Sequence, residues 1–591
     1  MTPKPLRLWP GIAAVVLQWL SRFGIKAVIP GIDGFAKAMM TSFVFTLLLI
    51  VWWAFFSRAR RLERLAALGL IAVALFATWQ LKHDSMWLQW LLAYAVPVLS
   101  LAFVTWAVVT RRMPDRVRHA TMVATILIAC GAWLFVRQDG MNGDHVLSFG
   151  WRWTASSEER LLAQSSTETR VPAAPAPAAS VAPVTAATPA ASPTASVAPE
   201  ASKSPTTQPV ETRAAWPGFR GPKRDGIVHG VKIDTDWSGK PPVQMWRHPV
   251  GPGWSSFAVN GDLVYTQEQR GENEVVSCYK ASTGQPVWIH QDAARFFESN
   301  AGAGPRATPT LSNGRVYTLG ATGILNVLDA ANGSVVWSRN VATETSTEIP
   351  FWGFAGSPLV VNDLVIAAAS GRLIAYDAAS GTRRWLGPAA GGSYSSPQLV
   401  TLDGVTQVLL VNGAGIMSVS VADGKQLWEH KWSSNSMVQP AVTADGDILL
   451  TSQDGGTRRL AVNRSGNGWT VGERWTSNAL KPYFNDFVVH KGYAFGFDGR
   501  ILACIDLQNG ERKWKGGRYG NGQLVLLPDQ DLLLVLSEEG ELALVAATPD
   551  QFIEKAKVPA IQGKTWNHPV LVGDMLLVRN AEEMAAFRLA R

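Results

Sequence analysis

Asp329-Ala-Ala-Asn-Gly-Ser-Val-Val-Trp337 shows the pattern that decides the fold of this chain: a Gly stands four residues before a Trp, and an alternating apolar run, Gly323–Asp329, precedes the turn. The pattern predicts a strand, a tight turn and a second strand. Asp accepts backbone N–H groups across such a turn, Gly adopts positive φ, and Trp offers a large apolar surface. Four further stretches repeat the spacing: Lys280–Trp288, Asp377–Trp385, Val421–Trp428 and Asp506–Trp514.

The repeat has a regular period. With Trp246 and Trp475 included, seven tryptophans follow one another at steps of 39 to 49 residues. A period of roughly 40–50 residues with four short strands per unit is typical of a β-propeller. A single four-stranded sheet cannot cover its own faces, so neighbouring sheets are expected to stack with the Trp rings between them.

The units predict an all-β, eight-bladed β-propeller. Seven complete units begin near Ser255, Thr308, Ser357, Ser396, Gln439, Asn485 and Gln523. The last piece, His568–Ala590, contains three predicted strands, and the first piece, Val243–Pro249, contains one. These two pieces are expected to form the eighth sheet together and so to close the ring. Blades five and seven depart from the turn pattern, so their limits are less sharply defined.

Composition excludes several functional classes. The chain has 591 residues and a formal net charge of +8, and much of its excess arginine lies in two short N-terminal loops. No basic stripe with interleaved aromatics is present, so no nucleic-acid partner is expected. The three cysteines, Cys130, Cys278 and Cys504, fall in separate units, and the nine histidines are scattered. No disulfide and no metal site are therefore predicted.

Residues 1–136 are predicted to be an α-helical membrane anchor with four to five spans. The apolar runs are Ala36–Phe56, Ala66–Leu81, Met86–Val109 and Ala120–Val136, of which the second is short for a span of about 20 residues.

Arginine residues orient these spans. Arginines cluster after the first run at 58, 60, 61 and 64 and after the third run at 111, 112, 116 and 118. The positive-inside rule places both clusters in the cytoplasm. The chain after Arg137 is then expected in the periplasm of a Gram-negative cell, anchored in the inner membrane.

The stretch Leu8–Pro30 leaves two alternatives open. It is apolar but contains Arg22 and Lys26. It is either a fifth span or an interfacial amphipathic helix. In both cases the C-terminal part lies on the same side of the membrane.

Three segments lead from the anchor to the propeller. Residues 137–169 form a short periplasmic juxtamembrane segment, with a predicted strand at Phe149–Thr154 and a capped helical turn at Ser156–Ala163. Residues 170–213 are almost entirely Ala, Pro, Ser, Thr and Val, which predicts a disordered linker and a propeller that is tethered to the anchor without docking on it. The propeller domain is expected to span residues 214–591, beginning with an ordered, turning segment.

That turning segment is rich in glycine and proline. Trp216-Pro-Gly-Phe-Arg-Gly-Pro-Lys-Arg-Asp-Gly226 is expected to cover part of the propeller before its first strand. An ion pair among Arg220, Arg224 and Asp225 is predicted to fix it in place.

From residue 214 onward the chain resembles the pyrroloquinoline quinone (PQQ)-repeat propellers, a superfamily of quinoprotein dehydrogenases and BamB-like outer-membrane assembly factors. The Asp-x-x-x-Gly-x-x-x-Trp units carry this resemblance, together with the Trp216–Gly226 stretch and Gly304-Pro-Arg-Ala-Thr-Pro309. The resemblance implies the fold without implying the cofactor, because the same repeat occurs in members that bind no quinone. The anchored layout is similar to that of membrane-bound glucose dehydrogenase.

A candidate site lies where loops lead into the innermost strands, over the central channel. There we expect a funnel for a ligand or partner, formed by an aromatic set with a few polar groups: Trp254, Arg306, Trp352, Tyr394, Asn485, Trp566 and His568. The alternative is that these rings only seal the channel.

Two functions follow from this site. The first is a non-catalytic scaffold that binds an unidentified periplasmic protein or peptide, with no cofactor, in envelope biogenesis. The second, implied by the resemblance, is a PQQ-dependent sugar or alcohol dehydrogenase that passes electrons to the membrane quinone pool. It would bind PQQ with Ca²⁺ and use Asp486 as the catalytic base. No Glu–Asn–Asp metal set and no adjacent-cysteine pair match that family's pattern, which favours the scaffold. A sensor that couples binding to the anchor is a third possibility, although no cytoplasmic signalling domain supports it.

Overall fold

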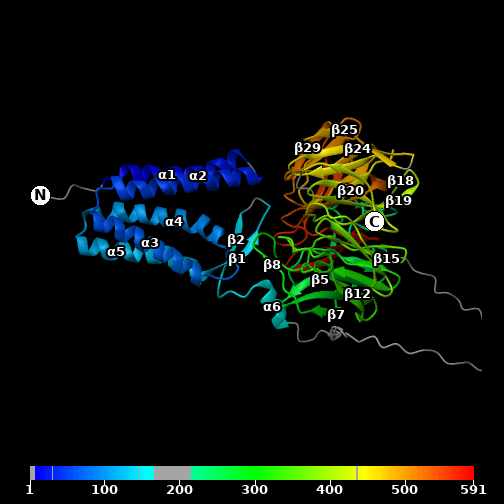
Figure 1. Cartoon of the computed structure of the whole chain (residues 1–591), viewed down its shortest axis with the longest axis horizontal. Helices are drawn as coiled ribbons and strands as arrows, with labels where there is room; N and C mark the ends of the chain where they lie inside the picture. The colour runs from blue at the N-terminus through cyan, green and yellow to red at the C-terminus, as the bar shows by residue number, and fades with distance from the viewer. Residues whose placement is uncertain (1–6, 30, 144–145, 165–214, 434–436, 467) are drawn as a thin grey trace, which may run out of the picture.

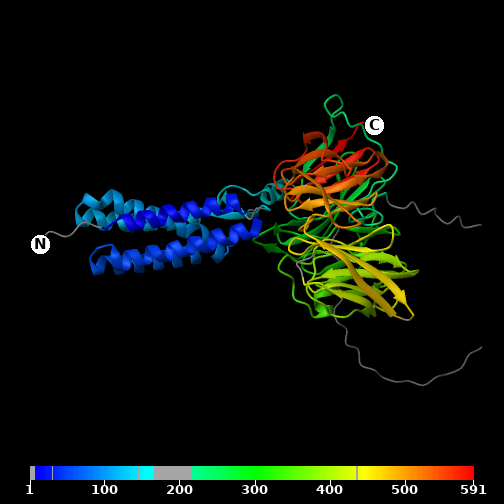
Figure 2. The same ribbon diagram turned by 90° about the horizontal axis from the view of Figure 1, so that it is seen from above.

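Eight four-stranded antiparallel sheets follow the helical N-terminal region, as the Trp pattern predicts. The computed structural model describes residues 7–29, 31–143, 146–164, 215–433, 437–466 and 468–591. The sheets form a ring at one end of the molecule, and the helices lie side by side at the other end (Figures 1 and 2). The long axes of the helices run toward the ring, so one end of each helix faces it. The prediction of an eight-bladed propeller is confirmed, as is that of N-terminal helices long and apolar enough to cross a membrane.

The first seven blades add their strands in chain order from the channel outward. The first seven innermost strands are β4 (Ala258–Asn260), β10 (Thr310–Ser312), β14 (Leu359–Val361), β18 (Gln398–Leu402), β22 (Ala441–Val442), β26 (Val488–His490) and β30 (Gln523–Leu527). The second strands are β5 (Leu263–Arg270), β11 (Arg315–Leu319), β15 (Leu364–Ala369), β19 (Val405–Asn412), β23 (Ile448–Ser452), β27 (Tyr493–Asp498) and β31 (Leu532–Leu536).

The two outer positions of these seven blades follow the same order. The third strands are β6 (Asn273–Lys280), β12 (Ile324–Asp329), β16 (Arg372–Asp377), β20 (Gly415–Ser420), β24 (Gly456–Ser465), β28 (Ile501–Asp506) and β32 (Glu541–Ala546). The outermost strands are β7 (Pro286–Asp292), β13 (Val335–Asn340), β17 (Arg383–Leu386), β21 (Gln426–Lys431), β25 (Gly468–Ser477), β29 (Arg512–Arg518) and β33 (Glu554–Pro559). Four further elements lie in the connections: the paired strands β8 (Phe297–Glu298) and β9 (Gly302–Ala303), the short helix α7 (Val341–Thr345) and the 3-10 turn η4 (Pro528–Gln530).

The two ends of the domain share the eighth sheet, as the sequence predicts. Strand β3 (Val243–Pro249) pairs with β36 (Glu583–Arg588), outside β35 (Met575–Arg579) and β34 (Val570–Val572). The N-terminal strand is therefore the outermost strand of the last blade, and no blade is left incomplete.

Trp and Gly of the repeat contact each other between successive blades. The indole N–H of Trp337 donates to the carbonyl of Ala378 in the next blade at 3.0 Å, and the ring lies against the turn at Gly381. Gly381 has φ +69°, and a Cβ there would overlap the Trp337 ring. The Gly is therefore required both by the turn and by the ring of the preceding blade.

A buried ionic group secures the junction between the first and last blades. Glu268 accepts from Arg270 at 3.0 Å and from the Tyr279 hydroxyl at 2.8 Å, while Arg579 donates to the carbonyls of Gln267 and Gly251, each at 3.0 Å. Burial alone would raise the pKa of Glu268, but the charges of Arg270 and Arg579 outweigh it and lower the pKa to about 2. This carboxylate therefore stays charged at neutral pH and fixes the closure.

Five N-terminal helices are long and apolar enough to cross a membrane. They are α1 (Trp9–Val28), α2 (Gly31–Val51, continued by η1, Trp52–Phe56), α3 (Arg61–Leu81), α4 (Leu88–Val109, continued by η2, Thr110–Arg112) and α5 (Asp115–Gly131, continued by η3, Ala132–Phe135). The apolar run Ala66–Leu81 looks short because α3 begins earlier, at Arg61. Glu63 lies in that added turn, where it is buried and forms an ion pair with Arg118 of α5.

Most of the stretch Leu8–Pro30 forms one continuous helix, α1, which packs against α2 and α4. Its Arg22 donates to the carbonyl of Ala93 in α4 at 2.9 Å and lies over the Tyr94 ring. Pro97 has no N–H, so the Ala93 carbonyl lacks its helical partner four residues on. Arg22 supplies the missing donor, which gives a physical reason for a charged residue in this apolar helix.

The segment after α5 forms a two-stranded hairpin and a helix. Strand β1 (Val136–Met141) pairs with β2 (Leu147–Trp151), and α6 (Ser157–Gln164) follows. The strand predicted at Phe149–Thr154 is present but begins two residues earlier and ends three residues earlier, and its partner β1 was not predicted. Ser156 and Glu159 form the expected capping box, in which each side chain accepts the other's backbone N–H.

The hairpin and α6 dock on the propeller, so the prediction of a propeller tethered without docking is wrong for the described residues. Glu158 of α6 pairs with Arg295 at 2.8 Å and accepts the Gly271 N–H at 2.7 Å. Trp90 of α4 also donates to the Ser299 hydroxyl at 3.2 Å. The hairpin lies between helices and ring in both views (Figures 1 and 2). The predicted linker, residues 170–213, lies outside the described residues.

Residues 215–242, which we call the lead-in, cross the channel from the first blade to the seventh. Trp216 bridges to Val259, and Ile227 bridges to Leu526. Arg224 is buried and donates to the carbonyls of Ser357 and Pro397 at 3.1 and 3.0 Å, and burial lowers its pKa to about 10. An ordered segment was expected here, and its arginines close one end of the channel.

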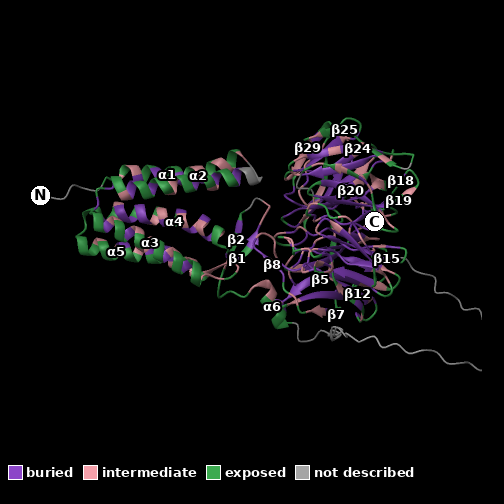
Figure 3. Ribbon diagram, in the orientation of Figure 1, coloured by how far each residue is buried: buried purple, intermediate pink, exposed green. Residues whose placement is uncertain are grey.

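Burial follows this division. Side chains inside the blades are buried, whereas the outer faces of the helices are exposed (Figure 3). Among the described residues, all three cysteines are buried and unpaired, with Cys278 in β6 and Cys504 in β28, the equivalent strands of blades one and six.

Candidate functional site: a capped chamber on the anchor-facing rim

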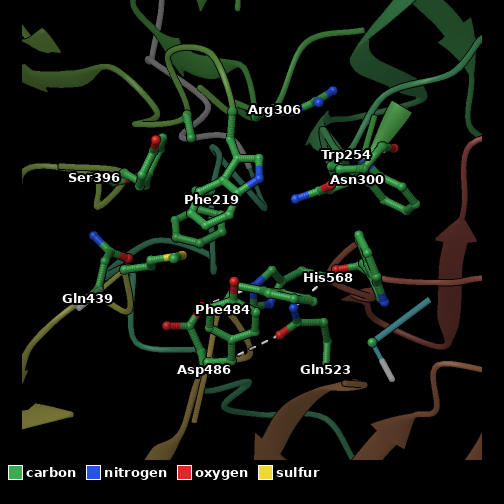
Figure 4. Close-up of a pocket in the computed structure, with 18 of the residues that line it drawn as sticks. Phe219, Trp254, Asn300, Arg306, Ser396, Gln439, Phe484, Asp486, Gln523 and His568 are labelled. Carbon is green, nitrogen blue, oxygen red and sulfur yellow. Dashed lines mark hydrogen bonds and ion pairs between the residues drawn. The ribbon is translucent and has the colours of Figure 1, made fainter. Parts of the chain in front are cut away.

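The connections that lead into the innermost strands form one rim of the propeller, which faces the helices. A cavity of about 210 Å³ lies under this rim. Six of the seven predicted funnel residues line it: Trp254, Arg306, Trp352, Tyr394, Trp566 and His568. We call this cavity the chamber (Figure 4).

Asn485, the seventh predicted residue, does not line the chamber. It is fully buried, and its side-chain oxygen accepts the Tyr483 N–H at 2.9 Å. Asn485 therefore shapes the loop that presents Tyr483 and Phe484, both of which do line the chamber.

Aromatic rings form a large part of the chamber wall. Trp254 and Trp566 lie 4.7 Å apart between ring centroids, and Phe484 lies 4.9 Å from Trp566. On the other side Trp352 lies 4.9 Å from Tyr394. Such a wall holds a flat or apolar group better than an ion.

Two chamber surfaces were not predicted from the sequence. Phe219 of the lead-in forms part of the wall and packs edge-on against His568 at 4.9 Å. Met141, Asn142 and Gly143 of the hairpin close the opposite side. The Trp216–Gly226 stretch hinted at the first surface, since it was expected to cover the propeller, but no local pattern links the hairpin to the rim.

The rim holds the hairpin through main-chain atoms. The Met141 N–H donates to the Asn300 carbonyl at 2.8 Å, and the Met141 carbonyl accepts from the Lys564 ammonium at 2.8 Å. The Gly143 N–H donates to Glu538 at 2.6 Å. A Cβ at Gly143 would overlap the Asn521 side chain, so a larger residue here would force Asn521 to move.

Lys564 occupies an unusual position between two rings. Its ammonium lies 4.5 Å from the Trp566 centroid and 5.0 Å from that of Trp254. Burial lowers the pKa of Lys564 to about 8, although the nearby carboxylates of Glu298 and Glu538 oppose that shift. The aromatic pair therefore already contacts a cation of this chain.

Arg306 is held by the protein itself. It pairs with Glu298 at 3.1 Å and donates to the carbonyls of Gly302 and Ala303 at 2.9 and 3.1 Å. Burial lowers the pKa of Arg306 to about 10, with Glu298 opposing the shift. The guanidinium is thus engaged in shaping its own loop.

Asp486 is buried in a three-member ionic group at the base of the chamber. It pairs with Arg220 at 3.4 Å and with His568 at 3.0 Å. Burial alone would raise the pKa of Asp486, but Arg220 and His568 hold it below its usual range. The predicted pairing of Arg220 or Arg224 with Asp225 is wrong, because Asp225 accepts the backbone N–H of Ile227 instead.

These contacts test whether PQQ fits the chamber. By family resemblance the quinone's carboxylates need free Arg or Lys partners, and its cation needs carboxylate and amide oxygens. Arg306 is already paired, Asp486 is paired on both oxygens, and Asn485 lies outside the lining. The residues present do not fit the group. Within the described ranges no cluster of three or more His, Cys, Asp or Glu is placed to hold a metal ion.

Comparison with known proteins identifies a family whose model matches the repeat region. The family model described as "Outer membrane protein assembly factor BamB" matches residues 243–397 and 352–553.

Individual proteins resemble smaller parts of the chain. An outer membrane protein assembly factor BamB of Moranella endobia is 27% identical over 247 residues, which cover 39% of this chain and 61% of that protein. A quinohemoprotein alcohol dehydrogenase of Comamonas testosteroni is 25% identical over 242 residues, covering 36% of this chain and 32% of that enzyme. The crystal structure of BamB from Moraxella catarrhalis aligns with a TM-score of 0.42 at 16% identity, covering 59% of this chain and 98% of that one.

Proposed function

This chain belongs to the family described as outer membrane protein assembly factor BamB, and from that premise we propose that it is a non-catalytic scaffold of envelope biogenesis. Its five helices anchor it in the inner membrane, and its rim binds an extended segment of a periplasmic protein or peptide. No cofactor takes part.

The observation that supports peptide binding is the way in which the rim holds the hairpin. Its contacts with Met141 and Gly143 use main-chain N–H and C=O groups, which every peptide offers. The described hairpin residues reach the loops at Asn300, Glu538 and Lys564. A partner segment has room along the remaining aromatic wall, at Trp352, Tyr394 and Tyr483.

The anchor supports a periplasmic position of the propeller. The two arginine-rich loops lie together, with Arg60 paired to Asp115 at 3.1 Å, at the end of the helices remote from the ring (Figure 1). Since arginine-rich loops stay in the cytoplasm, the ring is expected on the outer side of the inner membrane.

A quinoprotein dehydrogenase is the second candidate, supported by the similarity to the Comamonas enzyme. The pairing of Arg306 and Asp486 argues against it, because neither group is free for a quinone or a substrate proton. Dye-linked oxidation of sugars or alcohols by the full chain, after incubation with PQQ and Ca²⁺, is therefore expected to stay at background. Turnover that disappears in Asp486→Ala would reverse this ranking.

A photo-crosslinking experiment in cells tests the scaffold. A photoreactive residue at Tyr394 is expected to capture an envelope protein, whereas the same residue at Lys425, an exposed position in the blade-four turn, should not. Replacing Trp352 and Trp566 together by Ala removes the rings that would bury the partner's side chains, so the adduct should fall at least fivefold. Thermal unfolding of the purified variant checks that the propeller still folds. An adduct of unchanged yield, or equal capture from Lys425, would show that the rim is not the binding surface.

A further inference from the structure

One loop of the rim contacts the helical region as well as lining the chamber. It follows α7, covers residues 346–352, and carries Ile349 and Phe351, which are 48% and 44% exposed. In this propeller most large apolar side chains lie inside the blades, so two neighbouring exposed ones are unusual. We call this segment the membrane-proximal loop.

A tight turn gives the two rings of this loop opposite directions. The Gly353 N–H donates to the Pro350 carbonyl at 2.8 Å, which closes a turn around Phe351 and Trp352. Trp352 faces the chamber, where it packs on Tyr394, whereas Phe351 packs edge-on against Trp87 at 5.7 Å between centroids.

The base of the loop is fixed to the blade. The Phe354 N–H donates to the Ala321 carbonyl at 2.9 Å, and Phe354 is fully buried. The Thr347 N–H donates to the Ala342 carbonyl at 2.9 Å. Main-chain hydrogen bonds therefore fix the turn that carries the exposed side chains.

Trp87 places this loop at the end of a candidate membrane span. It directly precedes α4 and is 37% exposed, and the next residue, Leu88, is 42% exposed. Aromatic side chains at the ends of a span lie at the boundary between acyl chains and headgroups. Phe351, in contact with Trp87, reaches the same depth.

Further exposed aromatic rings lie on the hairpin and at the end of the last N-terminal helix. Trp151 and Trp153 are 55% and 68% exposed and stack on each other at 5.1 Å, and Phe135 lies 5.9 Å from Trp153. Exposed rings thus occur on the propeller, on the hairpin and at the helix ends, as in an aromatic belt.

We infer that Ile349 and Phe351 insert into the lipid interface beside Trp87, so that the propeller contacts the membrane surface directly through this loop. The inference rests on the proposed anchoring and adds a second, apolar contact with the same membrane. Glu348 is the adjacent charged residue, and an acidic side chain gives no attraction to anionic lipid. The contact is therefore expected to be insensitive to salt and to the fraction of anionic lipid.

Quenching by spin-labelled lipid tests the contact in the full chain. Glu348→Cys is labelled with an environment-sensitive fluorophore after reconstitution into lipid vesicles. The native cysteines are buried, and the chain without the Glu348 change provides the labelling blank. The Glu348 label should be quenched at least twofold by lipid carrying a nitroxide near the headgroup, and less by one deep in the acyl chain. In the Ile349→Asp/Phe351→Asp background most of this quenching should disappear.

Two control positions separate the inference from the proposed anchoring. A label at Leu101, exposed in α4, should be quenched most by the deep nitroxide, and a label at Val336, exposed in β13, should not be quenched. A Glu348 label that behaves like Val336 while Leu101 is quenched overturns the inference and leaves the anchor in place. An unquenched Leu101 overturns the anchoring and the inference together. Quenching at Glu348 that survives the double Asp change also overturns the inference, because it would not depend on Ile349 and Phe351.

Discussion

At the scale of single residues, the Gly and Trp of the repeat form one blade-to-blade contact. Gly333 of blade two has φ +74°, and its Cα faces the ring of Trp288 in blade one. The indole N–H of Trp288 donates to the Ala330 carbonyl of the same turn at 3.2 Å. The sequence predicted a turn glycine and a packing tryptophan within one unit, whereas the structure shows that each glycine receives the tryptophan of the preceding unit.

Gly333→Ala is expected to destabilise the propeller more than Gly314→Ala. Both positions have positive φ, but a Cβ at Gly333 would overlap Trp288 whereas nothing lies within 4 Å of one at Gly314. Left-handed backbone costs a residue with a Cβ about 1–2 kcal/mol, and overpacking adds about 1–3 kcal/mol. Thermal unfolding followed by tryptophan fluorescence should give a clearly lower Tm for Gly333→Ala. Equal losses of Tm would show that the ring contact contributes nothing.

At the scale of elements, polar side chains explain how α1, an apolar helix that contains Arg22 and Gln18, packs against its neighbouring helices. Pro97 deprives the Ala93 carbonyl of a helical donor, and Arg22 of α1 replaces it. Gln18, one turn earlier, donates to the Ser42 carbonyl of α2 at 3.1 Å. Polar residues that face neighbouring helices in this way stabilise a bundle whose outer surface is apolar.

Pro97→Ala should reduce the cost of Arg22→Leu. In the natural background Arg22→Leu leaves the Ala93 carbonyl without a donor, whereas an Ala at 97 restores the helical N–H. The expected coupling is about 1 kcal/mol, since interhelical hydrogen bonds in membranes average about 0.6 kcal/mol and reach about 1.7. Heating of detergent-solubilised protein with a thiol-reactive dye reports the unfolding of the anchor through buried Cys130, in a background with Cys278→Ala and Cys504→Ala. Additive effects of the two changes would contradict this role of Arg22.

Elements with a local pattern could be predicted from the sequence, and those fixed by distant partners could not. The strand at Val243–Pro249 was predicted at the bounds it has, because its alternation and the three-stranded remainder at the C-terminus each require a partner. The docking of the hairpin on the rim was not predicted. Main-chain atoms of Met141 and Gly143 make the contacts, and their partners are distant in the sequence: Asn300, Glu538 and Lys564. Such contacts produce no pattern in the local sequence.

Charge pairing in the chamber was equally hidden. Nothing near Asp486 in the sequence indicates that Arg220 and His568 neutralise it. The aromatic residues were easier to find, because their loops recur at the same place in every unit. The sequence therefore located the rim, whereas the structure was needed to show which of its charged groups are engaged.

At the scale of the whole molecule, the ring rests on the anchor through the hairpin and α6. Strand β1 reaches the chamber, and α6 contacts the first blade through Glu158. The chamber is thus assembled from the rim, the lead-in and the juxtamembrane hairpin. A ring that rotated freely relative to the helices would lose one wall of this chamber.

Cutting the chain between residues 165 and 214 should leave the ring attached to the anchor. With a protease site inserted after residue 190, the two fragments are expected to co-elute on size exclusion in detergent after cleavage, because the hairpin and α6 stay with the anchor fragment and still bind the ring. Glu158→Ala combined with Gly143→Val removes two of these contacts and should release a measurable fraction of the ring. Separate elution of the fragments without these substitutions would mean that the chain between them is the sole connection.

The pairing of β3 with β36 also sets an order of events during synthesis. β3 leaves the ribosome before any other strand of the ring, and its partner is the last to leave. Until then its edge has no hydrogen-bonding neighbour, which is the condition under which strands pair with the wrong chain. One blade of such a ring therefore stays unfinished until the last strand is made, and chaperones would have the most to protect during that interval.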